Sequence, residues 1–223
     1  MLRFGRAQAL YKLSKLDAVV LELQNISPEM EHYEDALYRK SQALYDLRRF
    51  IESMDILSLC CKKYPQNGRA RKLLRDATNR CVEETSGKYP FREMQDNVRN
   101  GITRLDHATY VGNIEVRQTR SSGRGLFTTA KVRAGDLLLC EKAFGCVHSR
   151  KDAFGHNYSQ GYSLRLDCAT AVPTARTELT LQVIRELNCR PSSIPQLMDL
   201  HHGSYTSVVP LSQGPRGQPI IDS

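Results

Sequence analysis

Hydrophobic and polar positions recur with helical spacing over the N-terminal part of the chain, and the pattern itself repeats. Residues 7–13 match residues 41–47 at an offset of 34, and five of the seven positions are identical. Leu16 and Phe50 lie at the same offset, and each is expected to begin a second helix. The pattern therefore predicts two consecutive helical hairpins with a period of 34 residues.

The ends of the two hairpins are predicted from proline, which cannot continue a helix. Pro28 and Pro65 mark these ends, and the second helix of the first hairpin is expected to be three residues shorter than its counterpart. A further helix is predicted over residues 67–84, because apolar side chains recur at helical spacing at positions 70, 73, 74, 77 and 81. Asn67 is expected to cap its N-terminus, and we interpret this helix as the one that closes the array.

The pattern changes to short strands after a connecting segment. Glycine and proline indicate a linker over residues 86–109, with a short helix at residues 91–98. Residues 114–117 alternate apolar and polar side chains, which predicts a strand. Residues 126–128 and 137–142 are predicted to form two more strands, and the last is expected to be the most fully buried because its apolar run is continuous.

The remaining part of the chain, residues 146–223, is predicted to contain two helices and a flexible tail. The helices are expected at residues 177–189 and around residues 194–200. Serine, proline and glycine are frequent from Gly203 onward, which is typical of a loop or a frayed end.

The amino-acid composition is that of a globular protein and gives no indication of a membrane protein. The 223 residues are 40% hydrophobic and 25% charged, as in an ordinary globular chain. No apolar stretch is long enough for a transmembrane helix, and the first residues do not resemble a secretory signal. The seven cysteines are odd in number, so we expect reduced thiols in a cytoplasmic or nuclear protein, with no membrane partner.

The formal charge of +8 leaves two interpretations open. Residues 1–90 and 91–150 each carry an excess of four positive charges, and residues 151–223 carry none, so the excess is spread along the chain. A solvated basic surface is the simpler interpretation, and an acidic partner or a phosphate backbone is the alternative. No recognition-helix or aromatic–basic motif supports nucleic-acid binding.

The helical repeat resembles the tetratricopeptide family, whose period is 34 residues. The second unit matches that family at its packing positions, which are Tyr38, Ala43, Tyr45, Leu47, Phe50 and Pro65. Ser53 and Lys40 depart from the pattern, and a hairpin duplicated by chance is the alternative. The resemblance implies a module that binds a protein or peptide partner. Its basic residues are either a surface for an acidic peptide or a solvated face: Arg39, Lys40, Arg48 and Arg49.

A Gly-x-Gly turn at Gly123–Gly125 is by itself typical of a tight hairpin. Residues 122–138, however, resemble the opening of a SET domain, and residues 105–112 and 140–144 extend the likeness. Together with the helices, the chain resembles eukaryotic tetratricopeptide–SET proteins, which are relatives of the SET-and-MYND methyltransferases. The resemblance implies an α+β chain: an N-terminal all-α tetratricopeptide-like repeat over residues 1–85, followed by a partial β-rich SET domain over residues 110–145 with a helical insert.

The SET family transfers a methyl group from S-adenosylmethionine to a protein lysine. The resemblance assigns cofactor contacts to one loop, formed by Gly123, Arg124, Gly125 and Leu126. Arg124 is further expected either to approach the carboxylate of the cofactor or to lie at a solvent-facing hairpin tip.

Two features of the SET family have no counterpart in this chain: an Asn-His-x-Cys segment and a later catalytic tyrosine. The nearest string, residues 187–190, lacks the histidine and falls on a predicted helix. His201 and His202 are interpreted as surface residues, and three tyrosines cannot be matched to the catalytic one: Tyr158, Tyr162 and Tyr205. We therefore assign no catalytic residue and no metal site, and the paired ligands of a MYND zinc module are missing. The chain alone is expected to be inactive; a non-catalytic scaffold that binds a protein or peptide is the alternative.

Overall fold

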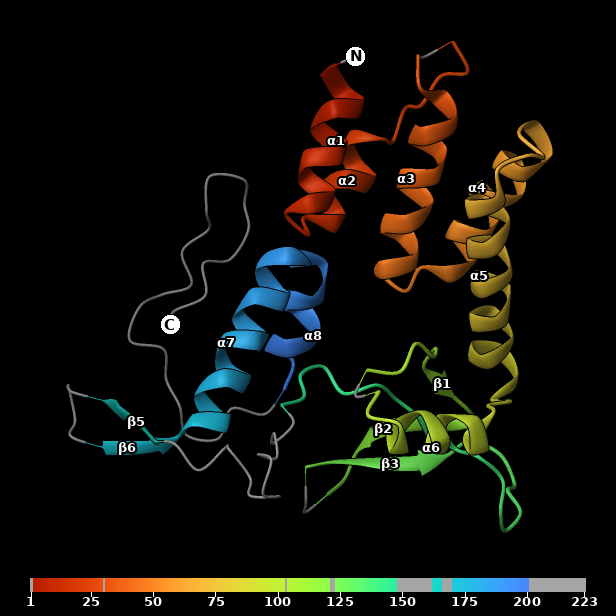
Figure 1. Cartoon of the computed structure of the whole chain (residues 1–223). Helices are drawn as coiled ribbons and strands as arrows, with labels where there is room; N and C mark the ends of the chain where they lie inside the picture. Colours follow the sequence, from red (N-terminus) through yellow and green to blue (C-terminus); the bar gives the residue numbers. More distant parts are fainter. Residues whose placement is uncertain are drawn as a thin grey trace. The chain divides into compact units, whose positions relative to one another are not determined.

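The computed structural model describes residues 2–29, 31–102, 104–120, 123–147, 162–165 and 170–200 (Figure 1). The chain divides into two compact units, one formed by Met1–Asn25 with Phe144–Ser223 and the other by Ile26–Ala143. Helices and antiparallel strand pairs occupy separate stretches of the chain, which is consistent with the predicted α+β class. None of the helices within these described residues combines the length and apolar character needed to cross a membrane.

The first unit brings together two segments that are far apart in sequence. Its elements are α1 (Leu2–Lys12), α2 (Leu16–Glu22), β5 (Tyr162–Arg165), β6 (Thr170–Pro173), α7 (Thr174–Cys189), the 3-10 turn η1 (Pro191–Ser193) and α8 (Ile194–Met198). Lys15 Nζ donates to the Asn188 carbonyl at 2.8 Å, and Asp17 accepts from the Ser192 amide at 3.1 Å. These two hydrogen bonds hold the α1–α2 hairpin against the C-terminal helices of the same unit.

Both predicted C-terminal helices are confirmed in this unit. Helix α7 begins three residues before the predicted start, and α8 ends two residues before the predicted end. The string at residues 187–190 lies at the end of α7, as expected. His201, His202, Tyr158 and Tyr205 lie outside the described residues, as does the predicted tail.

The second unit contains three packed helices, α3 (Tyr33–Asp46), α4 (Phe50–Lys63) and α5 (Gly68–Ser86), which lie side by side in Figure 1. Ala43 is fully buried, and the rings of Tyr45 and Phe50 meet edge to face at 5.2 Å, as the packing pattern predicts. Ser53, which departs from that pattern, donates its hydroxyl to the buried Ser41 carbonyl at 2.8 Å. The departure therefore adds a hydrogen bond between α3 and α4 where a smaller apolar residue would only pack.

The 34-residue period is visible in the backbone of the two helical turns. Ser14 and Arg48 both adopt the left-handed conformation, with φ of 55° and 61°. Each donates its amide to the carbonyl of a tyrosine, Tyr11 or Tyr45, at 2.9 Å. The helices that follow begin at Leu16 and Phe50, as predicted. Helix α2 is, however, 7 residues long against 14 for α4, so the predicted difference of three residues is wrong.

Ser14, with its left-handed backbone conformation, allows the strain in this turn to be tested by mutation. The left-handed conformation costs a residue with a Cβ about 1–2 kcal/mol of conformational free energy, and glycine avoids this cost. Because glycine also loses more entropy on folding, by about 0.5–1 kcal/mol, we expect Ser14→Gly to raise the free energy of unfolding by about 0.5 kcal/mol. Urea unfolding of the full chain measures it. Ser14→Ala, which keeps the Cβ, is the control, and an equal gain in that variant would contradict the explanation.

The capping helix begins as predicted. The side chain of Asn67 accepts a hydrogen bond from the Ala70 amide at 2.9 Å, and its amide group donates to Glu34 of α3 at 2.7 Å. Ala70 and Ala77 are fully buried against the other helices. The predicted linker contains α6 (Phe91–Arg99), in agreement with the expected short helix.

The strands of this region differ from the prediction in length and number. They are β1 (Tyr110–Val111), β2 (Ile114–Gln118), β3 (Arg124–Thr128) and β4 (Leu139–Cys140). The expected strand over residues 137–142 is reduced to two residues, and Leu139 is 39% exposed, so its predicted burial is wrong. Strand β4 pairs with β1, whereas β2 pairs with β3, which gives two separate antiparallel ladders. The apolar run at 137–142 could not reveal this, because a partner strand is chosen by long-range contacts.

Candidate functional site

The four residues assigned to cofactor contact lie on the hairpin formed by β2 and β3. Its register pairs Val116 with Leu126 and Gln118 with Arg124. The turn is closed at Thr119, whose amide and hydroxyl donate to the Gly123 carbonyl at 2.6 and 2.7 Å. These bonds fix the backbone where the predicted contact loop begins.

The two glycines of the turn have different roles. Gly123 has a φ of 75°, so it needs the conformational freedom of glycine, and open space surrounds the position where a Cβ would lie. Gly125 is already inside β3 and does not have a positive φ, which corrects the expectation that it belongs to the turn. A Cβ there would lie 2.9 Å from the Phe127 ring. A side chain at Gly125 would therefore displace the Phe127 ring, which is 41% exposed.

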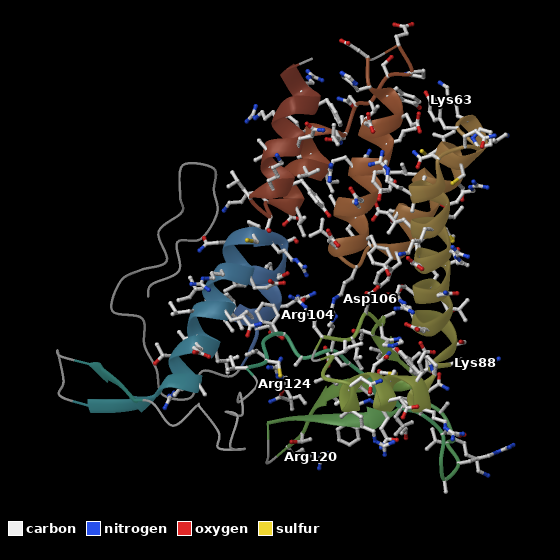
Figure 2. The ribbon with its side chains drawn as sticks, viewed as in Figure 1. Lys63, Lys88, Arg104, Asp106, Arg120 and Arg124 are labelled. Atoms are coloured by element: carbon white, nitrogen blue, oxygen red, sulfur yellow. The ribbon has the colours of Figure 1, made fainter. Side chains whose placement is uncertain are left out.

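The hairpin is basic and largely exposed. Figure 2 shows Arg120 and Arg124 at the same end of it. Arg117 forms an ion pair with Glu115 and lies over the Phe127 ring, 5.9 Å from its centre. Leu126 and its partner Val116 are 56% and 63% exposed, so the apolar face that they share is more open than covered.

A buried carboxylate, which the sequence did not mark, joins the capping helix to the segment before β1. Glu83 is 4% exposed. Its Oε1 atom lies 2.8 Å from Nη2 of Arg80 and 2.8 Å from Nδ1 of His107, and its Oε2 accepts from the Ala108 amide at 2.9 Å. Three groups therefore satisfy one carboxylate in a site with little water. We call Glu83, Arg80 and residues 105–108 the junction.

Two tyrosines extend the junction. Tyr45, in the last turn of α3, donates its hydroxyl to Asp106 at 2.6 Å, and Asp106 lies 3.7 Å from Nη1 of Arg80 (Figure 2). Burial, reinforced by the Asp106 carboxylate, raises the pKa of Tyr45 above its usual value. Tyr89 donates to the Ala108 carbonyl at 2.9 Å. The junction thus connects α3, α5 and the strand region through hydrogen bonds and ion pairs.

The end of α5 also contacts β1 closely. Gly87 ends the helix with a φ of 64°, and a Cβ placed on it would lie 2.7 Å from the Tyr110 ring. Lys142, just beyond β4, donates to the Leu105 carbonyl at 2.7 Å. Residues 105–112, which the sequence singled out only by family resemblance, are therefore held against α3 and α5 within one compact unit.

The arrangement contains no metal centre among the described residues, where no three histidine, cysteine, aspartate or glutamate side chains are grouped to bind an ion.

Some of the basic residues predicted to face an acidic peptide form hydrogen bonds within the protein instead. Arg49 forms two hydrogen bonds of 2.6 Å with Glu52, and Arg39 donates to Gln42 at 2.9 Å. Burial lowers the pKa of Lys40.

Comparison with known proteins gives one informative relative. A Gibberella zeae protein named methyltransferase is 30% identical to this chain over 192 residues, which is 85% of the chain. The chain spans 26% of that relative's length. No family model matches the chain, and no solved structure matches it. The 192 matched residues are therefore similar to one part of a protein that is named methyltransferase.

Proposed function

We propose that this chain supplies the interaction module and one cofactor-contacting hairpin of a SET-type protein-lysine methyltransferase that uses S-adenosylmethionine. The observation that carries the proposal is the β2–β3 hairpin, where Gly123 and Arg124 lie at an exposed turn in a chain related to a methyltransferase. The repeated helical turns support a tetratricopeptide-like module in the same chain, which would hold the protein substrate.

The residues of the hairpin fit the amino-acid end of such a cofactor. Gly123 presents backbone without a side chain, and no described residue beyond its chain neighbours lies within 4 Å of its missing Cβ. Arg124 is an exposed cation next to it, and an arginine can pair with a carboxylate through two parallel hydrogen bonds. When bound, the cofactor supplies an electrophilic methyl group. In our proposal Gly123 and Leu126 contact its methionine portion, and Arg124 orients its carboxylate.

We propose further that these 223 residues do not catalyse methyl transfer by themselves. A methyl transfer needs the amine and the methyl group held in line, in a channel from which water is excluded. The hairpin offers one wall: Leu126 and Val116 are more than half exposed. The contacts missing from the open side limit affinity as well as catalysis.

Titration of S-adenosylmethionine into the full chain tests the proposal. We expect a Kd no tighter than about 1 mM, equivalent to about 4.1 kcal/mol of binding free energy. Amide resonances in an NMR titration then locate the contact. The largest shifts are expected at Gly123, Arg124, Gly125 and Leu126. Arg124→Ala should weaken these shifts, while Arg120→Ala, which removes the same charge from the same turn, should leave them nearly unchanged.

Two outcomes would contradict this proposal. Tight binding would show that the chain forms a closed pocket without further protein. Shifts that avoid the hairpin, or an equal loss in Arg120→Ala, would remove the assigned contact. The second result would favour the non-catalytic scaffold, for which the repeated helical hairpins are the supporting observation.

A further inference from the structure

Positive charge is concentrated at one corner of the helical repeat. Residues 62–75, which cover the end of α4 and the start of α5, contain six basic side chains and no carboxylate. The remainder of the chain has 26 basic and 24 acidic residues, obtained by subtracting these six from 32, so its net charge is only +2. Counting charge over long segments of the chain gave an even distribution, but the basic residues are in fact clustered locally. We call it the basic corner, and its members are Lys62, Lys63, Arg69, Arg71, Lys72 and Arg75.

Most of the corner forms no hydrogen bond or ion pair within the part of the chain that the structure describes. Lys63 lies over the Tyr33 ring at 4.4 Å, and Arg69 lies 3.6 Å from the Asp35 carboxylate. The other four are exposed and form no hydrogen bond or ion pair with any residue that the structure describes: Lys62, Arg71, Lys72 and Arg75. Elsewhere on the repeat the cations behave differently, since Arg49 and Arg80 are each paired with a glutamate at 2.6 and 2.8 Å.

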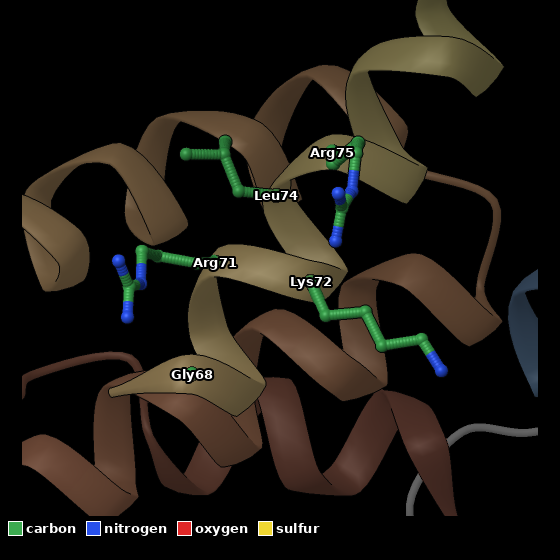
Figure 3. A pocket seen from close by; sticks show the side chains of 5 residues that line it. All are labelled: Gly68, Arg71, Lys72, Leu74 and Arg75. Carbon is green, nitrogen blue, oxygen red and sulfur yellow. The ribbon is translucent and has the colours of Figure 1, made fainter. Parts of the chain in front are cut away.

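Three of these four cations, Arg71, Lys72 and Arg75, line a hollow on α5. Figure 3 shows the pocket, which is lined by Gly68, Arg71, Lys72, Leu74 and Arg75. Arg71, Lys72 and Arg75 come three, four and seven residues after Gly68, so the four residues occupy one face of the helix. Ala70 and Ala77, which are fully buried against the other helices, lie on the opposite face. Leu74 is partly buried and adds an apolar surface among the three cations.

We propose that the basic corner is a docking surface for an acidic protein segment, in which aspartates or glutamates flank an apolar side chain. The carboxylates would pair with Arg71, Lys72 and Arg75, and the apolar side chain would contact Leu74. This combination favours a peptide over a nucleic acid, because a phosphate backbone is usually tracked by an extended basic stripe. Here the charge is confined to one corner, and its hollow has an apolar side. The surface is separate from the hairpin and does not depend on cofactor binding.

The test uses fluorescence anisotropy with the full chain. The probe is a labelled twelve-residue peptide that alternates glutamate and aspartate around a central leucine. The variant Arg71→Glu/Lys72→Glu/Arg75→Glu is expected to weaken its binding by about tenfold or more. The matched control, Arg92→Glu/Lys131→Glu/Arg133→Glu, changes the net charge equally at three other exposed sites and is expected to change the Kd by less than about twofold.

Three further measurements make the result decisive. Replacing the peptide's leucine with serine should weaken binding severalfold if Leu74 is contacted. An oligonucleotide of equal charge should bind more weakly than the peptide. Circular dichroism, with Arg71→Ala/Lys72→Ala/Arg75→Ala as a milder variant, checks that the helices remain folded. The proposal is overturned if the two charge-reversal variants weaken binding equally, if the oligonucleotide binds more tightly, or if the peptide does not bind at millimolar concentration.

Discussion

Replacing Glu83 with alanine is expected to lower the free energy of unfolding by about 3–5 kcal/mol. The carboxylate is buried and is bonded to Arg80, His107 and the Ala108 amide. Without it, the guanidinium of Arg80, whose side chain is only 12% exposed, loses its nearest counter-charge and keeps only the 3.7 Å contact with Asp106. A buried cation left without close compensation is costly, so the loss exceeds that of an ordinary hydrogen bond.

Urea unfolding of the full chain, followed by circular dichroism, measures this loss. Glu84→Ala is the matched control, because it removes the neighbouring carboxylate from an exposed position of the same helix. It should change the free energy of unfolding by no more than about 0.5 kcal/mol. Glu83→Gln keeps an acceptor for the Ala108 amide and should fall between the two. Equal losses in Glu83→Ala and Glu84→Ala would refute the role given to the junction.

Gly87→Ala is expected to destabilise the chain by about 2–4 kcal/mol, from two separable causes. The φ of 64° costs any residue with a Cβ about 1–2 kcal/mol. The Cβ would also lie 2.7 Å from the Tyr110 ring, so the ring or the end of α5 would have to move. Thermal or urea unfolding of the full chain measures the sum.

Gly101→Ala separates the two causes. Gly101 has a φ of 84°, but no atom of the described residues lies close to its missing Cβ, so this variant should show the conformational cost alone. A second test places Gly87→Ala in a Tyr110→Ala background, where the contact is gone and the added loss should shrink to that of Gly101→Ala. If Gly87→Ala and Gly101→Ala cost the same in the wild-type background, Tyr110 does not pack against α5 as described.

The helices could be predicted because their signals are local. An offset of 34 placed the starts of α2 and α4 at Leu16 and Phe50, and the side chain of Asn67 caps α5 as expected. The β2–β3 hairpin also followed from alternation and glycine, since both strands and the turn lie within fifteen residues of one another. The cofactor assignment on that hairpin came from resemblance and stays a prediction.

The pairing of β4 and the burial of Glu83 could not be predicted, because both depend on contacts between residues far apart in the sequence. An apolar run at 137–142 indicated a buried strand, but its pairing with β1 shortens it to β4 and leaves Leu139 partly exposed. Glu83 stands in the sequence Glu83-Glu84-Thr85 among polar residues, and a polar residue is ordinarily expected on the surface. Glu83 is buried because His107 and Ala108 pack against it, and the sequence around residue 83 does not predict that contact.

The hydrogen bond between Tyr45 and Asp106 has a consequence for the order in which the second unit can be assembled. It closes a stretch of 61 residues, whereas the Ser53–Ser41 bond between α3 and α4 closes only 12. Chain entropy makes the longer closure more costly by about 1.4 kcal/mol, from the logarithmic dependence on loop length. The short closure therefore becomes favourable first. The entropic cost of the Tyr45–Asp106 closure falls once α3, α4 and α5 have formed, because they reduce the freedom of the chain between these two residues.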